Sequence, residues 1–460
     1  MKWTFAGVCS LVVLTALAAV RHTAADEPQR NQLLFANGAG VQQTITTADS
    51  FDFDNPFFQD LGTNGRTCFT CHRPDQAWTV TPERIRERFL ITGGLDPIFR
   101  NNDGSNCENA DVSTLRKRRA AFSLLLAKGL IRIGIDVPAN AEFTIEDVDD
   151  PYNCGAPTTK ASLYRRPLPS TNLGFLSTVM WDGRETVKGQ AIVDDLATQA
   201  NDATTGHAQG APLSLTQARD IVKFETGLFT AQTFDYGAGS LRGNGALGGP
   251  AALSTQPFCI GINDPLNLLP VMPGACPTSS GGLNPNVFTI FNAWDLALLP
   301  QRRSIARGEA LFNTRSFAID NVGGLNGGAD DPIKGSFNGT CTICHDTPNS
   351  GNHSISMPLN IGLTGADRRT PDLPLYTLRN KTTQESVTTT DIGRAMVSGK
   401  WSDIGKFKGP ILRGLAARAP YFHNGSAATL EEAVDFYDTR FHIGLTTQEK
   451  KDLVAFLNAL

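Results

Sequence analysis

The sequence lacks the excess of positive charge that is typical of proteins that bind nucleic acids. Its 460 residues include 41 Lys and Arg against 45 Asp and Glu, which gives a formal net charge of -4 at pH 7. Binding to nucleic acid or to an anionic membrane surface depends mainly on clustered cations. We therefore expect neither of them as a partner of this protein.

Long apolar runs are also missing, except at the N-terminus. There Lys2 precedes a mostly apolar run from Phe5 to Val20 and the small residues Ala24 and Ala25, the order found in a secretory signal peptide. The run is shorter than the ~20 apolar residues that a membrane-spanning helix needs. We expect residues 1–25 to be removed on export and the mature protein to be free of the membrane.

Cysteine is scarce, and its distribution fits an exported protein. Of nine cysteines, Cys9 lies in the expected signal peptide and four lie in two short motifs described below. The other four are Cys107, Cys154, Cys259 and Cys276. In an oxidising compartment four cysteines allow three pairings, and proximity in the chain favours Cys107 with Cys154 and Cys259 with Cys276. Free buried thiols are the alternative.

The alternation of apolar and polar residues that marks strands is little evident, whereas apolar residues recur at helical spacing. The helices expected in the first half of the chain are 79–89, 115–126, 194–207 and 215–229. Segments rich in Gly, Pro, Asn and Asp separate them, and the longest, 237–285, is typical of a lid, a docking insertion or a mobile loop. We therefore predict an all-α protein with long loops and insertions.

The chain repeats its chemistry in its second half, which predicts two domains at 26–300 and 301–460. A short amphipathic helix at 307–312 would open the second domain. Near the C-terminus, Thr429 with Glu432 and Thr446 with Glu449 fit the capping box, in which each pair satisfies N–H groups at the start of a helix. Two terminal helices are therefore expected.

The strongest signals are two copies of Cys-x-x-Cys-His. The first copy comprises Cys68, Cys71 and His72, and the second comprises Cys341, Cys344 and His345. In this motif the two thiols add to the vinyl groups of a haem and the His supplies an axial nitrogen to the iron. A disulfide oxidoreductase motif or a zinc site would not explain a His directly after the second Cys in both copies. The sequence therefore predicts two covalently attached c-type haems.

Two further segments carry a family resemblance. They are WDGR at 181–184, after the first haem motif, and APYFHNGS at 419–426, after the second. Together with the motifs they resemble the bacterial di-haem cytochrome c peroxidases and the related MauG-type enzymes, over nearly all of 307–460 and much less over 26–300. The resemblance implies two cytochrome c-like haem domains in a periplasmic oxidoreductase.

The resemblance also assigns roles to single residues. In that family the N-terminal haem reacts with peroxide and the C-terminal haem receives the electrons, so His72 is cast as proximal ligand of the reactive iron and His345 as that of the relay iron. Trp181 stands where the family has a Trp between the haems, although a buried packing anchor is the commoner role of a Trp. Arg184 is expected at the cofactor, and His423 at a haem propionate or on the path between the haems.

The distribution of histidines bears on the first iron. Many di-haem peroxidases close the reactive iron with a His between the first haem motif and the bridging Trp. Here no His lies between His72 and Trp181. We therefore expect an open or water-bound iron at His72, unless Met180 or a residue of an inserted loop coordinates it.

The second iron needs a sixth ligand of its own. The family position is a Met in the peroxidases and a Tyr in the MauG type, and here it is Tyr437, with Met357 and Met396 as competitors. A phenolate would stabilise ferric iron, whereas a thioether would raise its potential. An ordinary core tyrosine is the alternative role of Tyr437.

Cleavage of the O–O bond needs a distal group that moves a proton from one peroxide oxygen to the other. The family supplies a Glu or Gln after the WDGR segment, and the nearest counterparts here lie in 199–209. His207 could carry protons, because imidazoles titrate near neutrality, and Gln209 could orient peroxide. The alternative for His207 is an exposed position at a helix end.

The family also holds a calcium ion between its domains, through backbone carbonyls near Ala419-Pro420 and an Asn before the Trp. Counting back from Trp181 places Arg166 at the Asn position. This argues against calcium, unless Asn172 compensates through a different loop path.

These features predict a periplasmic di-haem peroxidase. It would reduce hydrogen peroxide at the His72 iron, with electrons relayed from a small cytochrome c or cupredoxin through the His345 haem. Tyr437 and the missing His also fit a MauG-like or oxygenase enzyme that oxidises an organic or protein substrate. An electron carrier with both irons closed is the third interpretation.

Overall fold

The computed structural model describes residues 30–155, 157–259, 261–266, 282–352 and 358–460. The expected signal peptide, Cys276 and Met357 lie outside these ranges. Within them, no helix combines the length and the apolar character that crossing a membrane would require.

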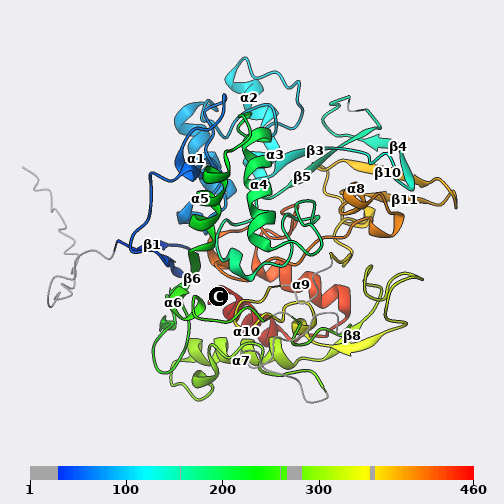
Figure 1. Ribbon diagram of the computed structural model, residues 1–460. Helices are drawn as coiled ribbons and strands as arrows, with labels where there is room; N and C mark the ends of the chain where they lie inside the picture. The colour runs from blue at the N-terminus through cyan, green and yellow to red at the C-terminus, as the bar shows by residue number, and fades with distance from the viewer. Residues whose placement is uncertain (1–29, 156, 260, 267–281, 353–357) are drawn as a thin grey trace, which may run out of the picture.

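The described residues form eleven strands as well as ten α-helices, so the all-α prediction is wrong and the fold is mixed α and β (Figure 1). The largest sheet has the antiparallel order β1 (Gln32–Ala36), β2 (Gly40–Thr46), β6 (Leu228–Asp235) and β7 (Gly239–Ser240). A second has the order β11 (Ser386–Thr389), β10 (Leu375–Asn380) and β4 (Phe143–Asp149). Two pairs complete the set, β3 (Ile131–Asp136) with β5 (Lys160–Arg165) and β8 (Phe317–Ile319) with β9 (Phe337–Gly339).

The α-helices of the described residues are α1 (Pro82–Thr92), α2 (Leu115–Ala121), α3 (Ser123–Lys128), α4 (Ile192–Gly206), α5 (Leu215–Thr226), α6 (Pro250–Leu253), α7 (Pro300–Thr314), α8 (Ala395–Ser398), α9 (Leu430–Phe441) and α10 (Thr447–Asn458). Helices α1 to α5 lie together in the upper part of the view in Figure 1, and α7, α9 and α10 lie together in its lower part. Helix α4 packs along α5, and α7 packs along α10. The four helices predicted in the first half are present, with the one expected at 115–126 divided into α2 and α3 at Phe122.

The C-terminal helices pack closely because one of them carries a glycine at the contact. A Cβ on Gly308 of α7 would lie 2.0 Å from the carbonyl oxygen of Asp452 in α10. Helix α7 is longer than the 307–312 predicted. The expected capping box of Thr446 and Glu449 is present at α10, whereas at α9 Thr429 caps alone, because Glu432 accepts from the N–H of Ala428 instead.

Strand β2 shows why the sheets escaped prediction. Only Val41 and Ile45 of its seven residues are less than fully buried, and the buried ones include Gln42 and Thr44. The Gln42 amide donates to the carbonyl of Pro74 at 2.9 Å, and the Thr44 hydroxyl bonds that of Thr230 at 2.7 Å. A strand that is covered on both faces has no apolar–polar alternation to read.

Strand pairing also joins the two halves of the chain. Strand β4 precedes residue 300, whereas its neighbour β10 follows it, and Tyr376 of β10 lies opposite Val148 of β4. The division into domains at 26–300 and 301–460 stays a prediction.

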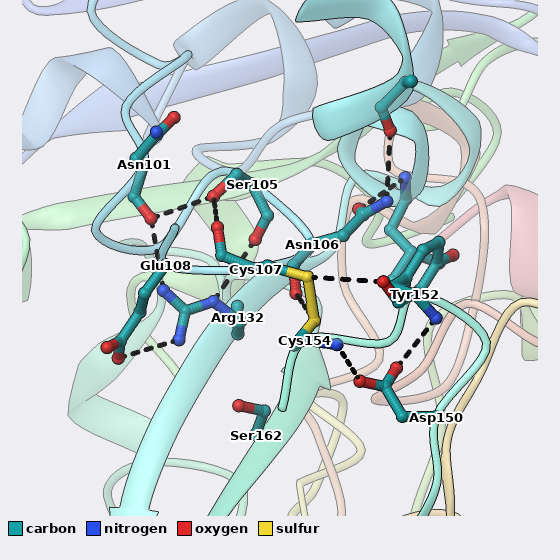
Figure 2. Close-up of a disulfide and its surroundings, with 12 residues drawn as sticks. Asn101, Ser105, Asn106, Cys107, Glu108, Arg132, Asp150, Tyr152, Cys154 and Ser162 are labelled. Carbon is teal, nitrogen blue, oxygen red and sulfur yellow. Dashed lines mark hydrogen bonds and ion pairs between the residues drawn. A yellow bond between two sulfur atoms is a disulfide. The ribbon is translucent and has the colours of Figure 1, made fainter. Parts of the chain in front are cut away.

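A disulfide fixes the loops on one side of β3 and β5 (Figure 2). Cys107 and Cys154, the pair that proximity in the chain favours, are joined with their Cα atoms 5.3 Å apart. The backbone N–H of Cys154 donates to Asp150 at 2.7 Å, so the second loop is also held by a local turn. The other expected pair, Cys259 with Cys276, includes a residue outside the described ranges.

Replacing Cys107 and Cys154 together with Ala should lower the free energy of unfolding by about 4 kcal/mol, because the bond closes a long loop in the unfolded chain. The sequence separation is 47 residues. Urea titration of the oxidised wild type and the double variant measures the difference. A change below about 1 kcal/mol would mean that the surrounding hydrogen bonds, not the covalent link, hold these loops.

Candidate functional site

Each Cys-x-x-Cys-His motif begins with a single 3-10 turn. The turns are η2 (Cys68–Thr70) and η6 (Cys341–Ile343). In both, the backbone N–H of the His donates to the carbonyl of the first Cys, at 3.0 Å for His72 and 3.1 Å for His345. The turns gather the two thiols and the imidazole of each motif on the wall of one cavity.

The two imidazoles are oriented in the same way. His72 Nδ1 donates to the carbonyl of Trp78 at 3.0 Å, and His345 Nδ1 donates to that of Gly351 at 3.1 Å. Such a bond fixes the tautomer and leaves Nε2 free as a metal ligand. Burial lowers the pKa of both imidazoles to about 4, so both are neutral and ready to coordinate.

The cavities at the two motifs are large and mainly apolar. The cavity at His72, called cavity 1, has a volume of about 1610 Å³ including the space at its mouth, and the cavity at His345, called cavity 2, has about 1750 Å³. The two thiols and the imidazole of each motif lie in the wall of one of these cavities, where a covalently attached haem would have to lie.

The cavities share one wall. The residues that line both are Arg166, Pro167, Leu168, Pro169, Trp181, Lys408, Pro410 and Arg418. Trp181 is fixed in this wall by its Nε1, which donates to the carbonyl of Arg166 at 2.8 Å, and its ring lies edge-on to His423 with the centroids 6.2 Å apart. The indole therefore lies in the wall between the two cavities, and its bridging role stays a prediction.

The shared wall contains three buried cations, Arg166, Lys408 and Arg418, whose charge bears on whether a haem would fit. Arg166 donates to the carbonyls of Lys128 and Arg418, Lys408 donates to that of Thr178, and no ion pair among the described residues involves Arg166 or Lys408. Burial lowers the pKa of Arg166 to about 9 and that of Lys408 to about 7.

Arg418 is the third cation and donates to the carbonyl of Ile411. In the wall of cavity 1, Arg413 Nε has no hydrogen-bond partner among the described residues. Buried cations without carboxylate partners are costly. Haem brings two propionate carboxylates per molecule, so the charge of this wall fits two haems.

The imidazole of His423 is also buried and makes no hydrogen bond within the described part of the chain. It lies in the wall of cavity 2, stacked on Phe407 with the ring centroids 4.0 Å apart, and neither ring nitrogen has a hydrogen-bond partner in the described part of the chain. Its Nε2 is 3.8 Å from a carboxylate oxygen of Asp391. This placement is compatible with either role predicted for His423, and the assignment stays a prediction.

The WDGR segment is held by a buried network of ion pairs. Asp182 pairs with Arg165 and with Arg184, and Arg165 pairs with Asp391 at 2.8 Å. Burial would raise the pKa of Asp182, but the charges of Arg165 and Arg184 lower it to about 2. Arg184 lines cavity 1, where its cofactor role is expected.

The two predicted distal residues lie in different places relative to cavity 1. His207, at the C-terminal end of α4, lines cavity 1, and its Nδ1 donates to Asp103 at 2.5 Å. Gln209 is exposed and does not line the cavity. Met180, the possible ligand named above, does line cavity 1. The structure thus brings His207, and not Gln209, to the first haem motif.

The candidates for the sixth ligand of the second iron also differ in place. Tyr437, on α9, lines cavity 2 together with Cys344 and His345. Met396 lies in a different apolar cluster, with Phe143 and Ile392, and Met357 is outside the described residues. Among the candidates that the structure describes, only Tyr437 is at the site.

Two residues in the wall of cavity 1, Glu225 and Asp103, were not predicted from the sequence. Glu225 is buried there, one of its carboxylate oxygens has no partner among the described residues, and burial raises its pKa to about 7. It lies on the buried face of α5 with Ile221 and Val222, and a carboxylate on an apolar face is a signal that could have found it. Asp103 lies in a polar loop and gives no such signal.

At the position where the family has the calcium-binding Asn, this chain has Arg166, whose side chain already has backbone partners. The guanidinium of Arg166 donates to the carbonyls of Lys128 and Arg418, next to the Ala419-Pro420 segment. Asn172, the named substitute, instead exchanges side-chain hydrogen bonds with the backbone of Thr230. The described residues contain no group of three or more His, Cys, Asp and Glu side chains that could hold a metal.

The described part of the 237–285 segment packs on the second haem motif. The Asn263 amide donates to the hydroxyl of Thr342 at 2.8 Å, and the backbone N–H of Asn263 donates to Asp346 at 3.0 Å. The residues around Asn263 therefore support the motif and do not form a separate lid.

Comparisons with known proteins bear on the family. No protein-family profile matches the chain. The chain is 35% identical over 132 residues to the cytochrome-c peroxidase IdrP2 of Denitromonas iodatirespirans, covering 26% of this chain and 36% of that protein. It is 41% identical over 76 residues to the cytochrome c peroxidase Ccp of Escherichia coli strain K12, covering 16% of each.

A solved structure described as a MauG-like protein associated with microbial copper homeostasis aligns over 93% of both chains, with 15% identity and a TM-score of 0.38. The chain spans about a third of the length of the first peroxidases that it matches. Several relatives at 32% identity or more nevertheless carry the same description. The resemblance read from the haem motifs is therefore confirmed, and the chain is related to the cytochrome c peroxidases, a family of oxidoreductase enzymes.

Proposed function

We propose that this protein is a periplasmic di-haem c-type peroxidase. It binds one haem covalently through Cys68 and Cys71 and a second through Cys341 and Cys344. Hydrogen peroxide is reduced in cavity 1, and electrons arrive from a small cytochrome c or cupredoxin through cavity 2. The observation that carries the proposal is the wall that the two cavities share at Trp181.

The haems would supply the redox chemistry, because each iron can accept and release electrons while it holds a ligand. His72 Nε2 and His345 Nε2 would hold the two irons, and each ring is oriented by one backbone carbonyl. The cations of the shared wall would bind the propionates. Trp181 connects the cavities, fixed in place by its bond to Arg166.

His207 is the group of this chain that acts on peroxide. It lies in the wall of cavity 1, on the opposite end of its helix from the WDGR segment. There it accepts a proton from one peroxide oxygen and returns it to the other, the task of a general acid–base. The side chain is 41% exposed, so its protons can equilibrate with solvent after each turnover.

One observation favours a second function. Tyr437, not a methionine, is the sixth-ligand candidate in cavity 2. A phenolate ligand stabilises high oxidation states of iron, which would suit an enzyme that oxidises an organic or protein substrate. Such an enzyme would use peroxide as oxidant without turning over a cytochrome donor.

Steady-state oxidation of reduced cytochrome c by hydrogen peroxide separates these functions. The holoprotein should oxidise the donor catalytically, with two donor molecules consumed per peroxide, because reduction of peroxide to two waters takes two electrons. Pyridine haemochrome analysis of the same sample should give two haems per chain. Fewer than one donor oxidised per chain, with both haems present, would contradict the peroxidase assignment.

A further inference from the structure

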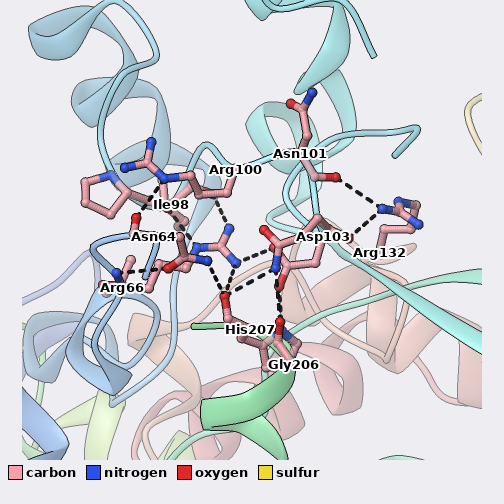
Figure 3. Close-up of polar contacts among 12 residues, drawn as sticks. Asn64, Arg66, Ile98, Arg100, Asn101, Asp103, Arg132, Gly206 and His207 are labelled. Atoms are coloured by element: carbon pink, nitrogen blue, oxygen red, sulfur yellow. Dashed lines mark hydrogen bonds and ion pairs between the residues drawn. The ribbon is translucent and has the colours of Figure 1, made fainter. Parts of the chain in front are cut away.

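The imidazole of His207 belongs to a chain of three side chains (Figure 3). Its Nδ1 donates to one carboxylate oxygen of Asp103 at 2.5 Å, and Arg66 donates to the other. Arg66 and Asp103 are buried, with side chains 3% and 7% exposed. All three residues line cavity 1. Arg66 and Asp103 therefore determine how the imidazole of His207 is oriented in the cavity wall.

Arg66 cannot move away from this arrangement, because its remaining donors are also used. Its Nε donates to the carbonyl of Pro97 and its Nη2 to that of Ile98, both at 2.8 Å. A guanidinium with this many fixed partners is a rigid support. Although burial raises the pKa of the Asp103 carboxyl, its bonds to His207 and Arg66 outweigh burial and lower it, so Asp103 is ionised.

The backbone of His207 is fixed as well as its ring. Its carbonyl accepts from Asn64 at 2.8 Å and from Arg66 and Asn102 at 3.2 Å. These bonds satisfy a carbonyl at the C-terminal end of α4, which would otherwise lack an intrahelical partner. Capping alone would explain them, but it would not explain the contact between Asp103 and the imidazole.

An ionised carboxylate only accepts hydrogen bonds, so Asp103 requires the proton of the neutral imidazole to be on Nδ1. Nε2 is then a free acceptor. We infer that Asp103, supported by Arg66, is a positioning residue that presents His207 Nε2 as the proton acceptor for hydrogen peroxide in cavity 1. This inference rests on the proposed function.

His207 Nε2 takes the proton of one peroxide oxygen and gives it to the other, which leaves as water when the O–O bond breaks. The positive charge that His207 carries between these events is stabilised by Asp103. Two electrons from the reduced cytochrome or cupredoxin and two protons from solvent turn the remaining oxygen into the second water.

Cyanide tests the relay apart from turnover. Hydrogen cyanide must lose its proton to bind ferric haem as cyanide, so a free Nε2 accelerates its association. Asp103→Asn reverses the tautomer, because the amide donates to Nδ1 and drives the proton to Nε2. His207→Gln removes the base and keeps the Arg66–Asp103 pair. Both variants should slow cyanide association by about tenfold or more, and the spectral response of the ferric holoprotein to peroxide by about 10²-fold.

Asn102→Ala is the matched control, because it removes a bond to the His207 carbonyl and leaves the imidazole untouched. It should associate with cyanide as the wild type does. If cyanide association is slowed equally in Asn102→Ala and Asp103→Asn, the contact serves only to cap the helix and the inference is overturned. A rate of cyanide association in Asp103→Asn equal to that of the wild type would also overturn it. A change of the ferric haem from low spin to high spin in His207→Gln would make His207 an iron ligand, which also overturns it.

The cyanide result is independent of the peroxidase assay. If the wild type fails to oxidise a cytochrome donor while the variants slow cyanide association as expected, the proposed function fails and the positioning of His207 stands. If the donor is oxidised but the cyanide rates do not differ, the positioning of His207 fails and the proposed function stands.

Discussion

Replacing Cys68 and Cys71 with Ala should remove one haem per chain and abolish peroxide-dependent oxidation of the donor. Both thiols line cavity 1, so their loss would remove the covalent links at the site where we propose that peroxide reacts. A haem held there by His72 alone would be lost on purification. The absorbance of the pyridine haemochrome should fall by half, and the rate of donor oxidation should fall to that of donor and peroxide alone.

The second motif gives a contrasting result. Cys341→Ala with Cys344→Ala should also halve the haem content and stop donor oxidation, but the remaining haem should still respond to peroxide in its absorption spectrum. Cys107→Ala with Cys154→Ala is the control, because it also removes two cysteines and leaves both motifs intact. If the haem still responds to peroxide when Cys68 and Cys71 are replaced, and no longer does so when Cys341 and Cys344 are replaced, the roles of the two cavities are the reverse of those proposed.

Trp181→Phe should retain both haems and lower the rate of donor oxidation by about 10²-fold, the loss typical of a small misplacement at a reacting centre. The smaller ring leaves part of the shared wall empty and loses the bond from Nε1 to the carbonyl of Arg166. Stopped-flow absorption of the reduced protein, mixed with peroxide, follows the electron transfer directly.

Trp294→Phe is the matched control for this variant. Trp294 is fully buried in the C-terminal core, lines neither cavity, and also donates from Nε1 to a backbone carbonyl, that of Gly243 at 3.0 Å. The control therefore repeats the chemical change away from the cavities. Equal rates for Trp181→Phe and the wild type would show that electrons do not pass through the indole.

The haem motifs were predictable because their chemistry requires neighbouring residues. Two thiols and an imidazole must reach one macrocycle, and a five-residue motif records that requirement in the sequence. Tyr437 was named from the family resemblance, which places a sixth ligand on the helix that begins after Thr429, and its role as a ligand stays a prediction.

The sheets depend on contacts that local patterns do not record. Strands β4 and β10 pair although Tyr376 and Val148 are far apart in the chain. Strand β3 is different, because Ile131, Ile133 and Ile135 alternate as a half-buried strand requires. That signal was present in the sequence and was outweighed by the many loop residues around it.

The support of His207 could not be predicted for the same reason. Asp103 lies 104 residues before His207, and Arg66 lies still further away, yet the fold joins them at one wall of cavity 1. The polar loop around Asp103 resembles any exposed turn. Only the fold shows that its carboxylate is buried and paired.

The central claim is that peroxide reacts in cavity 1 while electrons reach it from the haem of cavity 2. Rapid mixing of peroxide with holoprotein in which only the haem at His345 is reduced tests it most directly. The account predicts that this haem is oxidised as fast as peroxide is consumed, and about 10²-fold more slowly in Trp181→Phe. A haem at His345 that stays reduced while peroxide disappears would contradict it.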